Sequence, residues 1–262
     1  AFPRRLYRHP STLLDCRFAT IDVFLNFLIY VPIIMGINLL GSKVMGALVG
    51  VTSWEPPKTL SMIWSVSAAV GFVLFNDFLT YWGHVLFHKV PALWSFHQVH
   101  HSAEVLTPVT AYRAHPVELI GFALITAPSV GLASVFYQNL VGPPLQVTAI
   151  FGISILGLLG SHLRHSHILF SFGPVISRII LSPAQHVIHH SVDTQHWNKN
   201  FGVKFAFWDG LFGTLYVPKG TESIRVGLPG ADPREFSTVQ KLYFRPFAKA
   251  AGGLVPLLGR KG

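Results

Sequence analysis

The amino-acid sequence predicts an all-α fold, an integral membrane helical bundle of about four spans with a histidine-rich cap on the cytoplasmic side. Half of the 262 residues are hydrophobic and only 12% are charged, about half of the charged share of a soluble domain. The formal net charge is nevertheless +9. This combination excludes a disordered chain and a coiled coil, and it disfavours a soluble nucleic-acid-binding protein. We therefore expect no nucleic acid among the partners.

Four stretches are long and apolar enough to cross a bilayer, which takes roughly 20 residues. They are residues 21–40, 60–82, 117–140 and 144–161. Polar residues and prolines interrupt the first and third stretches, but neighbouring helices can satisfy the backbone at such points. An alternative is that the first stretch continues through Gly50 as a re-entrant hairpin.

The basic residues predict the orientation. With four spans, residues 1–20, 83–116 and 162–262 lie on one side of the membrane, and they contain 18 of the 20 Lys and Arg residues. Only Lys43 and Lys58 fall on the other side. The positive-inside rule makes the basic side cytoplasmic. We expect a multi-pass protein of the bacterial inner membrane rather than of the endoplasmic reticulum.

The sequence shows no repeat, no low-complexity segment and no sign of a second domain. The basic N-terminus continues through Asp15 and Asp22 into a full-length apolar stretch, which is not typical of a cleavable signal peptide. Because the first residue is Ala1 and not Met, we expect that an upstream segment can be missing. Residues 1–262 are interpreted as one membrane domain, with 218–262 as an interfacial tail.

Two stretches of the cytoplasmic part mix apolar and basic residues, 168–181 and 239–258. They fit interfacial helices on an anionic leaflet. Ordinary amphipathic helices packed on the cytoplasmic cap fit the same pattern equally well.

Histidine is the second compositional anomaly, because 14 histidines stand against 11 acidic residues. Ten of them fall in blocks with spacings of three and four, which place side chains on one face of a helix. They are His84, His88, His97, His100, His101, His162, His165, His186, His189 and His190. Without a metal, so many imidazoles in an apolar setting would leave polar nitrogens unsatisfied. Ten ligands are too many for one ion and enough for two, so we expect a metal-binding cap.

The remaining histidines and the cysteine narrow this interpretation. His9, His167 and His196 are typical of hydrogen-bonded interfacial histidines. The single cysteine, Cys16, excludes a disulfide framework and any cysteine-based zinc or iron–sulfur site. Imidazole is a good ligand of iron, zinc and copper, so the metals would be bound by nitrogen.

The order of these motifs resembles the fatty acid hydroxylase/sterol desaturase superfamily, the membrane-bound di-iron enzymes with histidine motifs. The resemblance covers about residues 75–217. It rests on HxxxH, HxxHH, a later histidine, a final HxxHH, Asn-aromatic-Gly and Trp-Asp-x-x-Phe-Gly-Thr, and on the segment 112–118. These motifs stand here as His84/His88, His97/His100/His101, His165, His186/His189/His190, Asn200-Phe201-Gly202 and Trp208-Asp209-Gly210-Leu211-Phe212-Gly213-Thr214. One departure is His165-Ser166-His167, where the family usually has His-Ser-Asn.

The resemblance implies an O2-dependent di-iron oxidoreductase that hydroxylates or desaturates an unactivated C–H bond of a membrane lipid. Its cofactors would be two Fe ions, with O2 as co-substrate and zinc as a substitute in a purified sample. No catalytic residue is expected beyond the metal ligands. The groups expected to orient the ligands are Asp77, Glu104, His115, Glu118, His167, Asp193, Asn200 and Asp209. Arg113 is expected to pair with Glu118 or with a lipid head group, and Asp77 either supports the site or reaches solvent.

The reaction would need electrons from a separate donor. The sequence has no His-Pro-Gly-Gly haem segment, no four-cysteine cluster and no GxGxxG loop. We therefore expect a ferredoxin-like or cytochrome-like donor, and the basic face suits an acidic one.

Several alternatives stay open. The lipid can be a sterol, a fatty acyl chain, an alkylglycerol, an ornithine lipid or a carotenoid, and the short chain favours hydroxylation over desaturation. A histidine-rich metal transporter and a bis-histidine haem protein are alternatives of other classes.

Overall fold

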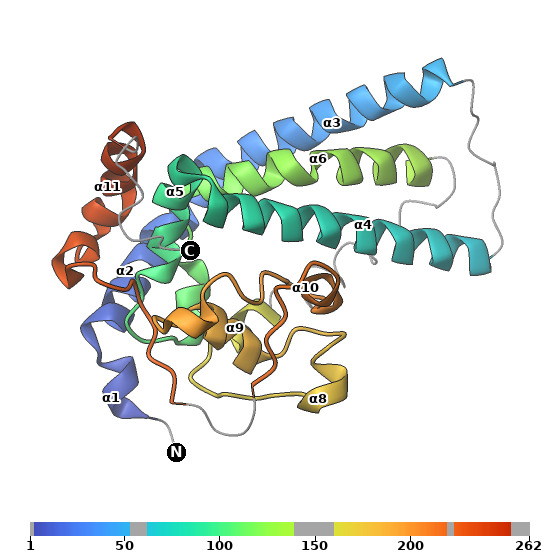
Figure 1. Ribbon diagram of the computed structural model, residues 1–262. Helices are drawn as coiled ribbons and strands as arrows, with labels where there is room; N and C mark the ends of the chain where they lie inside the picture. The colour runs from blue at the N-terminus through green and yellow to red at the C-terminus, as the bar shows by residue number, and fades with distance from the viewer. Residues whose placement is uncertain (1–2, 53–61, 139–159, 219–222, 253–262) are drawn as a thin grey trace.

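The computed structural model describes residues 3–52, 62–138, 160–218 and 223–252, and the regular secondary structure of this part is helical apart from two isolated β-bridges. Figure 1 shows three long helices side by side, with the shorter helices gathered at one end. The long helices are α3 (Val31–Val51), α4 (Met62–Lys89) and α6 (Pro116–Gln138). Helix α6 packs against both of the others. The expected all-α class is confirmed.

The first long helix begins well before the expected span. Helix α2 (Pro10–Leu25) continues through a π-helical turn, η1 (Asn26–Tyr30), into α3. The whole run, Pro10–Val51, has 42 residues and is about 63 Å long at 1.5 Å per residue. That is about twice the thickness of a bilayer core, so only part of the run can cross. The re-entrant hairpin through Gly50 is wrong, because the backbone stays helical to Val51.

The long helices have the surface of a membrane protein. In the described part, two segments are long and apolar enough to cross a bilayer, Pro10–Val51 and Pro116–Phe136. Their large side chains are open to the surroundings, and Phe27 and Leu28 are 78% and 75% exposed. A continuous apolar surface of this size would promote aggregation in water, whereas lipid chains solvate it. The fourth expected stretch, 144–161, lies almost wholly outside the described residues.

Small residues let α3 and α6 approach closely. A Cβ atom on Gly131 would lie 2.5 Å from the backbone oxygen of Gly41, and one on Gly41 would lie 2.9 Å from that of Ala127. Ser134 Oγ donates to Ser42 Oγ at 2.7 Å in the same interface. Close backbone contact and hydroxyl bonding are how helices associate in lipid, where burial of apolar surface gives little.

The cap consists of short helices. They are α1 (Arg4–Tyr7), α5 (Pro91–His101), η2 (Pro108–Tyr112), α8 (Gly173–Ile176), α9 (Pro183–His189), η3 (Thr194–His196), α10 (Phe207–Leu211), η4 (Pro233–Phe236) and α11 (Val239–Ala251). Helix α9 begins with a capping box, in which Ser182 and Gln185 satisfy each other's backbone N–H groups. Proline at the first position of α5 and α9 suits a helix start.

The two mixed apolar–basic stretches have different structures. A helix over 168–181 is wrong, because only Gly173–Ile176 is helical and the rest pairs with a loop, through Leu181 N to Lys204 O and Ala206 N to Ile179 O. The other stretch forms α11, which buries Leu242 in a core cluster with Phe18. It therefore packs on the cap as an amphipathic helix.

A buried ion pair links helix α2 to the cap. Arg113 Nη1 lies 2.8 Å from Asp15 Oδ1, with side-chain exposures of 2% and 0%. Thr110 Oγ1 donates to the other carboxylate oxygen of Asp15 at 2.7 Å. Arg113 Nη2 also donates to Ser102 Oγ at 2.8 Å and to Phe236 O at 3.4 Å. The expected pairing of Arg113 with Glu118 is wrong, because α2 supplies the acid.

Removal of the Asp15 charge should destabilise the whole protein. In Asp15→Asn the guanidinium of Arg113 loses its counter-charge inside the cap, and breaking a buried pair typically lowers the free energy of unfolding by about 3–5 kcal/mol. We expect a clear fall of the thermal midpoint in neutral detergent. The matched control is Asp232→Asn, whose partner Arg234 is exposed and whose midpoint should hardly move. Equal midpoints for the two variants would contradict a stabilising role of the buried pair.

Candidate metal centre

Nine buried or nearly buried histidines converge in two groups, and within each group the ligand nitrogens lie within 4.8 Å of one another. The first group is His84, His88, His97, His101 and His189, and the second is His100, His165, His186 and His190. They come from the end of α4, from α5, from α9 and from the turn that follows residue 160. Segments far apart in sequence thus meet at one point of the cap.

Each HxxHH block is divided between the two groups. In α5, His97 and His101 belong to the first group and their nitrogens are 3.2 Å apart, whereas His100 belongs to the second. In α9 the assignment is reversed. His186 and His190 form the 3.2 Å pair in the second group, and His189 reaches into the first. The i, i+4 pair of each helix therefore serves one position and the i+3 histidine serves the other.

The distances between ring nitrogens are those of a coordination shell. His165 Nε2 lies 3.0 Å from His100 Nε2 and 2.9 Å from His186 Nε2. In the first group His84 Nε2 lies 3.1 Å from His97 Nε2. Two nitrogens bound to one metal at about 2.0–2.1 Å are separated by about 2.9 Å at a right angle and about 3.4 Å in a tetrahedron. Both groups fit that range.

Backbone carbonyls fix the tautomers in the second group. His165 Nδ1 lies 2.8 Å from Ser161 O, and His100 Nδ1 lies 3.2 Å from Arg113 O. A neutral imidazole has one N–H, and in both rings it is used at the carbonyl. The two Nε2 atoms, 3.0 Å apart, then present lone pairs to each other and cannot hydrogen-bond.

Protonation does not relieve this contact. Burial lowers the pKa of His165 well below its usual value, and burial lowers the pKa of His100 to about 3. A metal cation between the rings would turn the repulsion into coordination, and neutral imidazole suits iron, zinc or copper. The residues present therefore fit a transition metal.

The first group is oriented in the same way. His84 Nδ1 lies 2.7 Å from Phe201 O, and His189 Nδ1 lies 2.9 Å from Lys199 O. His97 Nδ1 lies 2.9 Å from a carboxylate oxygen of Glu118, which is buried. Partners of this kind set the ring orientation of metal ligands and make them more basic. The segment 199–201 therefore holds two rings of the first group.

Asp209 holds that segment in place. One of its carboxylate oxygens accepts from Phe201 N at 2.7 Å and from Thr214 Oγ1 at 2.6 Å, and the other accepts from Gly202 N at 2.8 Å. A Cβ atom at residue 202 would lie 2.5 Å from Phe205 O, so the turn requires glycine. The Asp and Thr of the Trp-Asp-x-x-Phe-Gly-Thr motif thus act on the carbonyl that orients His84.

Asn200 links the same segment to α9. Its backbone has φ +55°, a left-handed conformation that asparagine tolerates. The side chain donates to Gln185 O at 3.0 Å and accepts from Tyr216 N at 2.8 Å. The histidines of α9 and the carbonyls of 199–201 are therefore positioned relative to each other by one amide.

The other expected supporting groups lie away from the ligand rings. The buried Asp77 accepts from Phe205 N at 3.2 Å and pairs with Lys204 at 3.5 Å, so it does not reach solvent. The rest have their own partners, as follows: His115 with Tyr243 O, Asp193 with Arg225, His167 with the ring of Tyr7, and Glu104 with His9. His162, the tenth histidine of the blocks, lies outside both groups with Nδ1 2.7 Å from Pro108 O.

The sequence pattern missed the carbonyls that orient the rings. Ser161, Arg113 and Lys199 contribute through backbone oxygens, which every residue has, so no residue type could mark them. The Asn-Phe-Gly motif was the one available signal for this segment.

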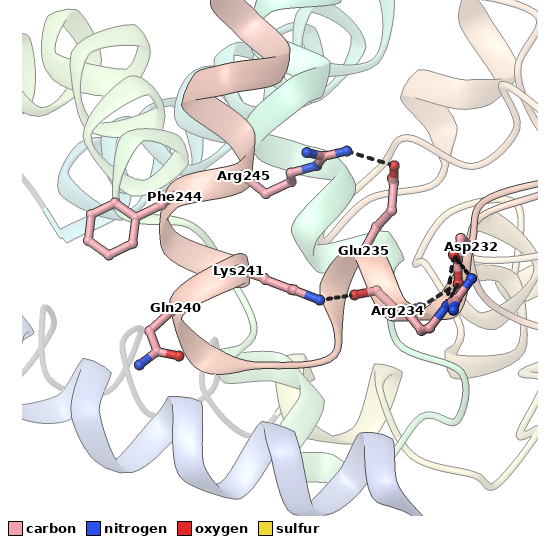
Figure 2. A pocket seen from close by; sticks show the side chains of 7 residues that line it. All are labelled: Asp232, Arg234, Glu235, Gln240, Lys241, Phe244 and Arg245. Carbon is pink, nitrogen blue, oxygen red and sulfur yellow. Dashed lines mark hydrogen bonds and ion pairs between the residues drawn. The ribbon is translucent and has the colours of Figure 1, made fainter.

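A hollow lies between η4 and α11 (Figure 2). It is lined by Asp232, Arg234, Glu235, Gln240, Lys241, Phe244 and Arg245. Its charges are internally paired, with Arg245 Nη2 at 3.0 Å from Glu235 Oε1 and Lys241 Nζ donating to Arg234 O at 2.7 Å. No histidine lines it, and it is not part of the candidate metal centre.

Fold and site together define a helical membrane protein with a paired histidine centre at one end of its long helices. The comparison with known families agrees: residues 69–214 match the family model described as fatty acid hydroxylase. This match covers more than half of the chain, and the chain belongs to that family.

Several characterised proteins are similar over part of their length. The ornithine lipid hydroxylase OlsE of Rhizobium tropici is 31% identical over 163 residues, 61% of this chain and 45% of the relative. The alkylglycerol monooxygenase of Caenorhabditis elegans is 24% identical over 196 residues, 72% and 35% of the two chains. The very-long-chain aldehyde decarbonylase GL1-8 of Oryza sativa subsp. japonica is 30% identical over 152 residues, 57% and 52%. The matched part thus spans about half or less of these relatives. No solved structure matches.

Loss of the Asp209 carboxylate should weaken metal binding. Asp209→Asn replaces one acceptor oxygen by an NH2 group facing the backbone N–H of residue 201 or 202, so Phe201 O shifts away from His84. Removing such a supporting partner typically weakens metal affinity about 10–100-fold. Metal content after competition with a chelator measures this. Asp193→Asn, whose partner Arg225 is exposed, is the matched control, and equal metal retention in both variants would refute the supporting role.

Acid should destabilise the metal-free protein below pH 6.5. Burial lowers the pKa of His186, His189 and His190 well below the usual value of 6.5. The unfolded chain takes up protons there that the folded chain does not, so folding stability falls as the pH falls. Each such histidine lowers the free energy of unfolding by about 1 kcal/mol at pH 5.5. Thermal midpoints between pH 5 and 8 measure this, with the metal-loaded protein as the less sensitive sample. A flat profile of the metal-free protein would contradict neutral buried histidines.

Proposed function

We propose that this protein is a membrane oxygenase that hydroxylates an unactivated C–H bond of a membrane lipid, with one iron at each histidine group. The observation that carries this is the approach of ring nitrogens to about 3 Å in both groups, with the tautomers turned so that lone pairs face inward. The relatives support a lipid as substrate, because two of the three are named as lipid or alkylglycerol oxygenases.

The first iron would be held by His84, His88, His97, His101 and His189, and the second by His100, His165, His186 and His190. When bound, the irons supply the O2-dependent abstraction of hydrogen from an alkyl chain, which no side chain can perform. The protein orients the rings of His100, His165, His189 and His84 through the backbone carbonyls of residues 113, 161, 199 and 201. Zinc can occupy the same nitrogens in a purified sample. His162 is assigned to positioning, because it contacts Pro108 O.

Burial keeps the centre dry and its imidazoles neutral. His101 and His190 are 4% and 1% exposed, and their rings are stacked at 4.4 Å across the two groups. Glu118 Oε1 lies 2.9 Å from His97 Nδ1, the shortest distance between a carboxylate and a ring of either group in the described part. We assign it the role of balancing part of the positive charge of the first iron.

The distribution of basic residues supports a proposal for the placement in the membrane. We propose one membrane domain with four spans and with the histidine cap on the cytoplasmic side of a bacterial inner membrane, where most basic residues gather. A separate electron donor, ferredoxin-like or cytochrome-like, would bind the basic cap. Binding of an acidic donor should then weaken as ionic strength rises.

The geometry disfavours the two alternative classes. A transporter would spread histidines along a path through the bilayer, whereas these nitrogens meet within 4.8 Å. Two axial histidines on opposite faces of one haem iron place their nitrogens about 4 Å apart at the metal–nitrogen distance of about 2.0 Å. Contacts of 2.9–3.2 Å within each group leave no room for a porphyrin between the rings.

Replacement of a single histidine in either group should remove the iron of that group and leave the other iron bound. We expect about two irons per chain in the wild type and about one in His189→Ala or in His165→Ala, because each variant removes a ligand from one group only. Iron per chain by elemental analysis measures this, and oxidised lipid in cells that express each variant should be lost in both.

His167→Ala is the matched control, because His167 is exposed and lies against Tyr7. It should keep both irons. A wild-type protein reconstituted with iron that retains none would refute the proposed centre.

A further inference from the structure

One arginine directly precedes a histidine of the second group in the sequence, and no acid in the described ranges forms an ion pair with it. Arg164 directly precedes His165 at the end of the helical turn that starts at residue 160. Its side chain folds back along the helix, and Nη1 lies 3.2 Å from the position that a Cβ atom on Gly160 would take. The residue is partly buried. Its guanidinium is therefore held against the helical turn that precedes His165 and is partly shielded from water.

Arg164 forms no hydrogen bond or ion pair with a residue in the described ranges. Asp77, the acid whose charge acts on Arg164, forms its ion pair with Lys204. The stretch from 139 to 161 contains no Asp or Glu in the sequence. Arg178, another cation of the cap without an acidic partner in the described ranges, is exposed, and its Nε donates to Pro174 O.

The charge of Arg164 acts on the centre. Burial and, to a smaller extent, Arg164 lower the pKa of His165 and of His186. Burial also lowers the pKa of Arg164 itself, to about 10, although Asp77 opposes this. The guanidinium is therefore still charged at neutral pH. The histidine ligands are neutral and Glu118, the acid assigned to charge balance, lies at the first group, so a metal ion in the second group would add positive charge beside Arg164.

We propose that Arg164 binds the anionic head group of the substrate, a carboxylate or a phosphate, and that the substrate is therefore an acidic amphiphile. This inference rests on the proposed function and narrows its substrate class. Arginine suits the role, because its planar donors pair with both oxygens of a carboxylate or phosphate. An anion there would compensate a partly desolvated cation that no acid of the described cap neutralises.

The test compares ligands that differ only in the head group. The full chain is purified in neutral detergent, and tryptophan fluorescence measures the binding of palmitate, hexadecyl phosphate and hexadecanol. Inorganic phosphate alone is the fourth probe. A charge-assisted hydrogen bond contributes enough for about a tenfold change in affinity. We expect the wild type to bind palmitate or hexadecyl phosphate about tenfold more tightly than hexadecanol, and inorganic phosphate only weakly.

The variants assign this preference to one residue. Arg164→Gln should bind the anionic probes about tenfold more weakly and hexadecanol unchanged, whereas Arg164→Lys should keep part of the preference. Arg178→Gln is the matched control and should behave as the wild type. The inference is overturned if the wild type binds all three chains equally, if the preference survives in Arg164→Gln, or if inorganic phosphate binds as tightly as hexadecyl phosphate.

Two further outcomes distinguish a damaged fold, or failure of the proposed reaction, from failure of the inference. If Arg164→Gln also loses hexadecanol binding, its fold is damaged, and Arg164→Lys is then compared with the wild type. A full preference of Arg164→Lys for the anionic probes supports the inference. An equally low affinity of Arg164→Lys and the wild type for these probes overturns it. Binding is measured without turnover, so an anion preference with no oxidised product in an iron-loaded sample would refute the proposed reaction and leave the role of Arg164 standing.

Discussion

The cap depends on one physical constraint, the approach of neutral imidazole rings whose lone pairs point at one another. His100 and His165 show it most clearly, because each spends its only N–H on a backbone carbonyl and their Nε2 atoms are 3.0 Å apart. Burial removes protonation as a remedy. The arrangement is favourable only around cations, so metal binding and the stability of the cap are coupled.

The surrounding structure serves to hold those carbonyls. Asp209 and Asn200 fix the segment that orients His84 and His189, and they use backbone N–H groups to do so. On the other side, Arg113 lends its carbonyl to His100 while its guanidinium is anchored by Asp15 of the N-terminal helix. A change in α2 can therefore reach the second histidine group through a single buried ion pair.

The position of the centre explains the division of the molecule. The long helices expose apolar side chains along their length. Helices α5 and α9, which carry the two HxxHH blocks, lie toward one end of them (Figure 1). A lipid chain can remain in an apolar setting up to the ligands, whereas a charged head group needs a partner. The cation at Arg164 would supply it next to His165.

The sequence by itself predicted the family and the histidines of the candidate centre. Apolar length and low charge indicated the membrane helices. The repeated three- and four-residue spacings selected ten histidines, and the structure brings nine of them together. The family resemblance came from the same residues. These properties depend on composition and on the helical period, which act locally along the chain.

Only the tertiary structure decided how the ligands are shared. The helical period places the histidines of an HxxHH block on one face, but that face is wide enough to point at two metal positions. Docking of α5 against α9 sends His97 and His101 to one position and His100 to the other, with the reverse order in α9. The acid for Arg113 and the carbonyls that set the tautomers also come from segments distant in sequence. Spacing within one helix carries no information about these partners, because they are fixed by the packing of other elements.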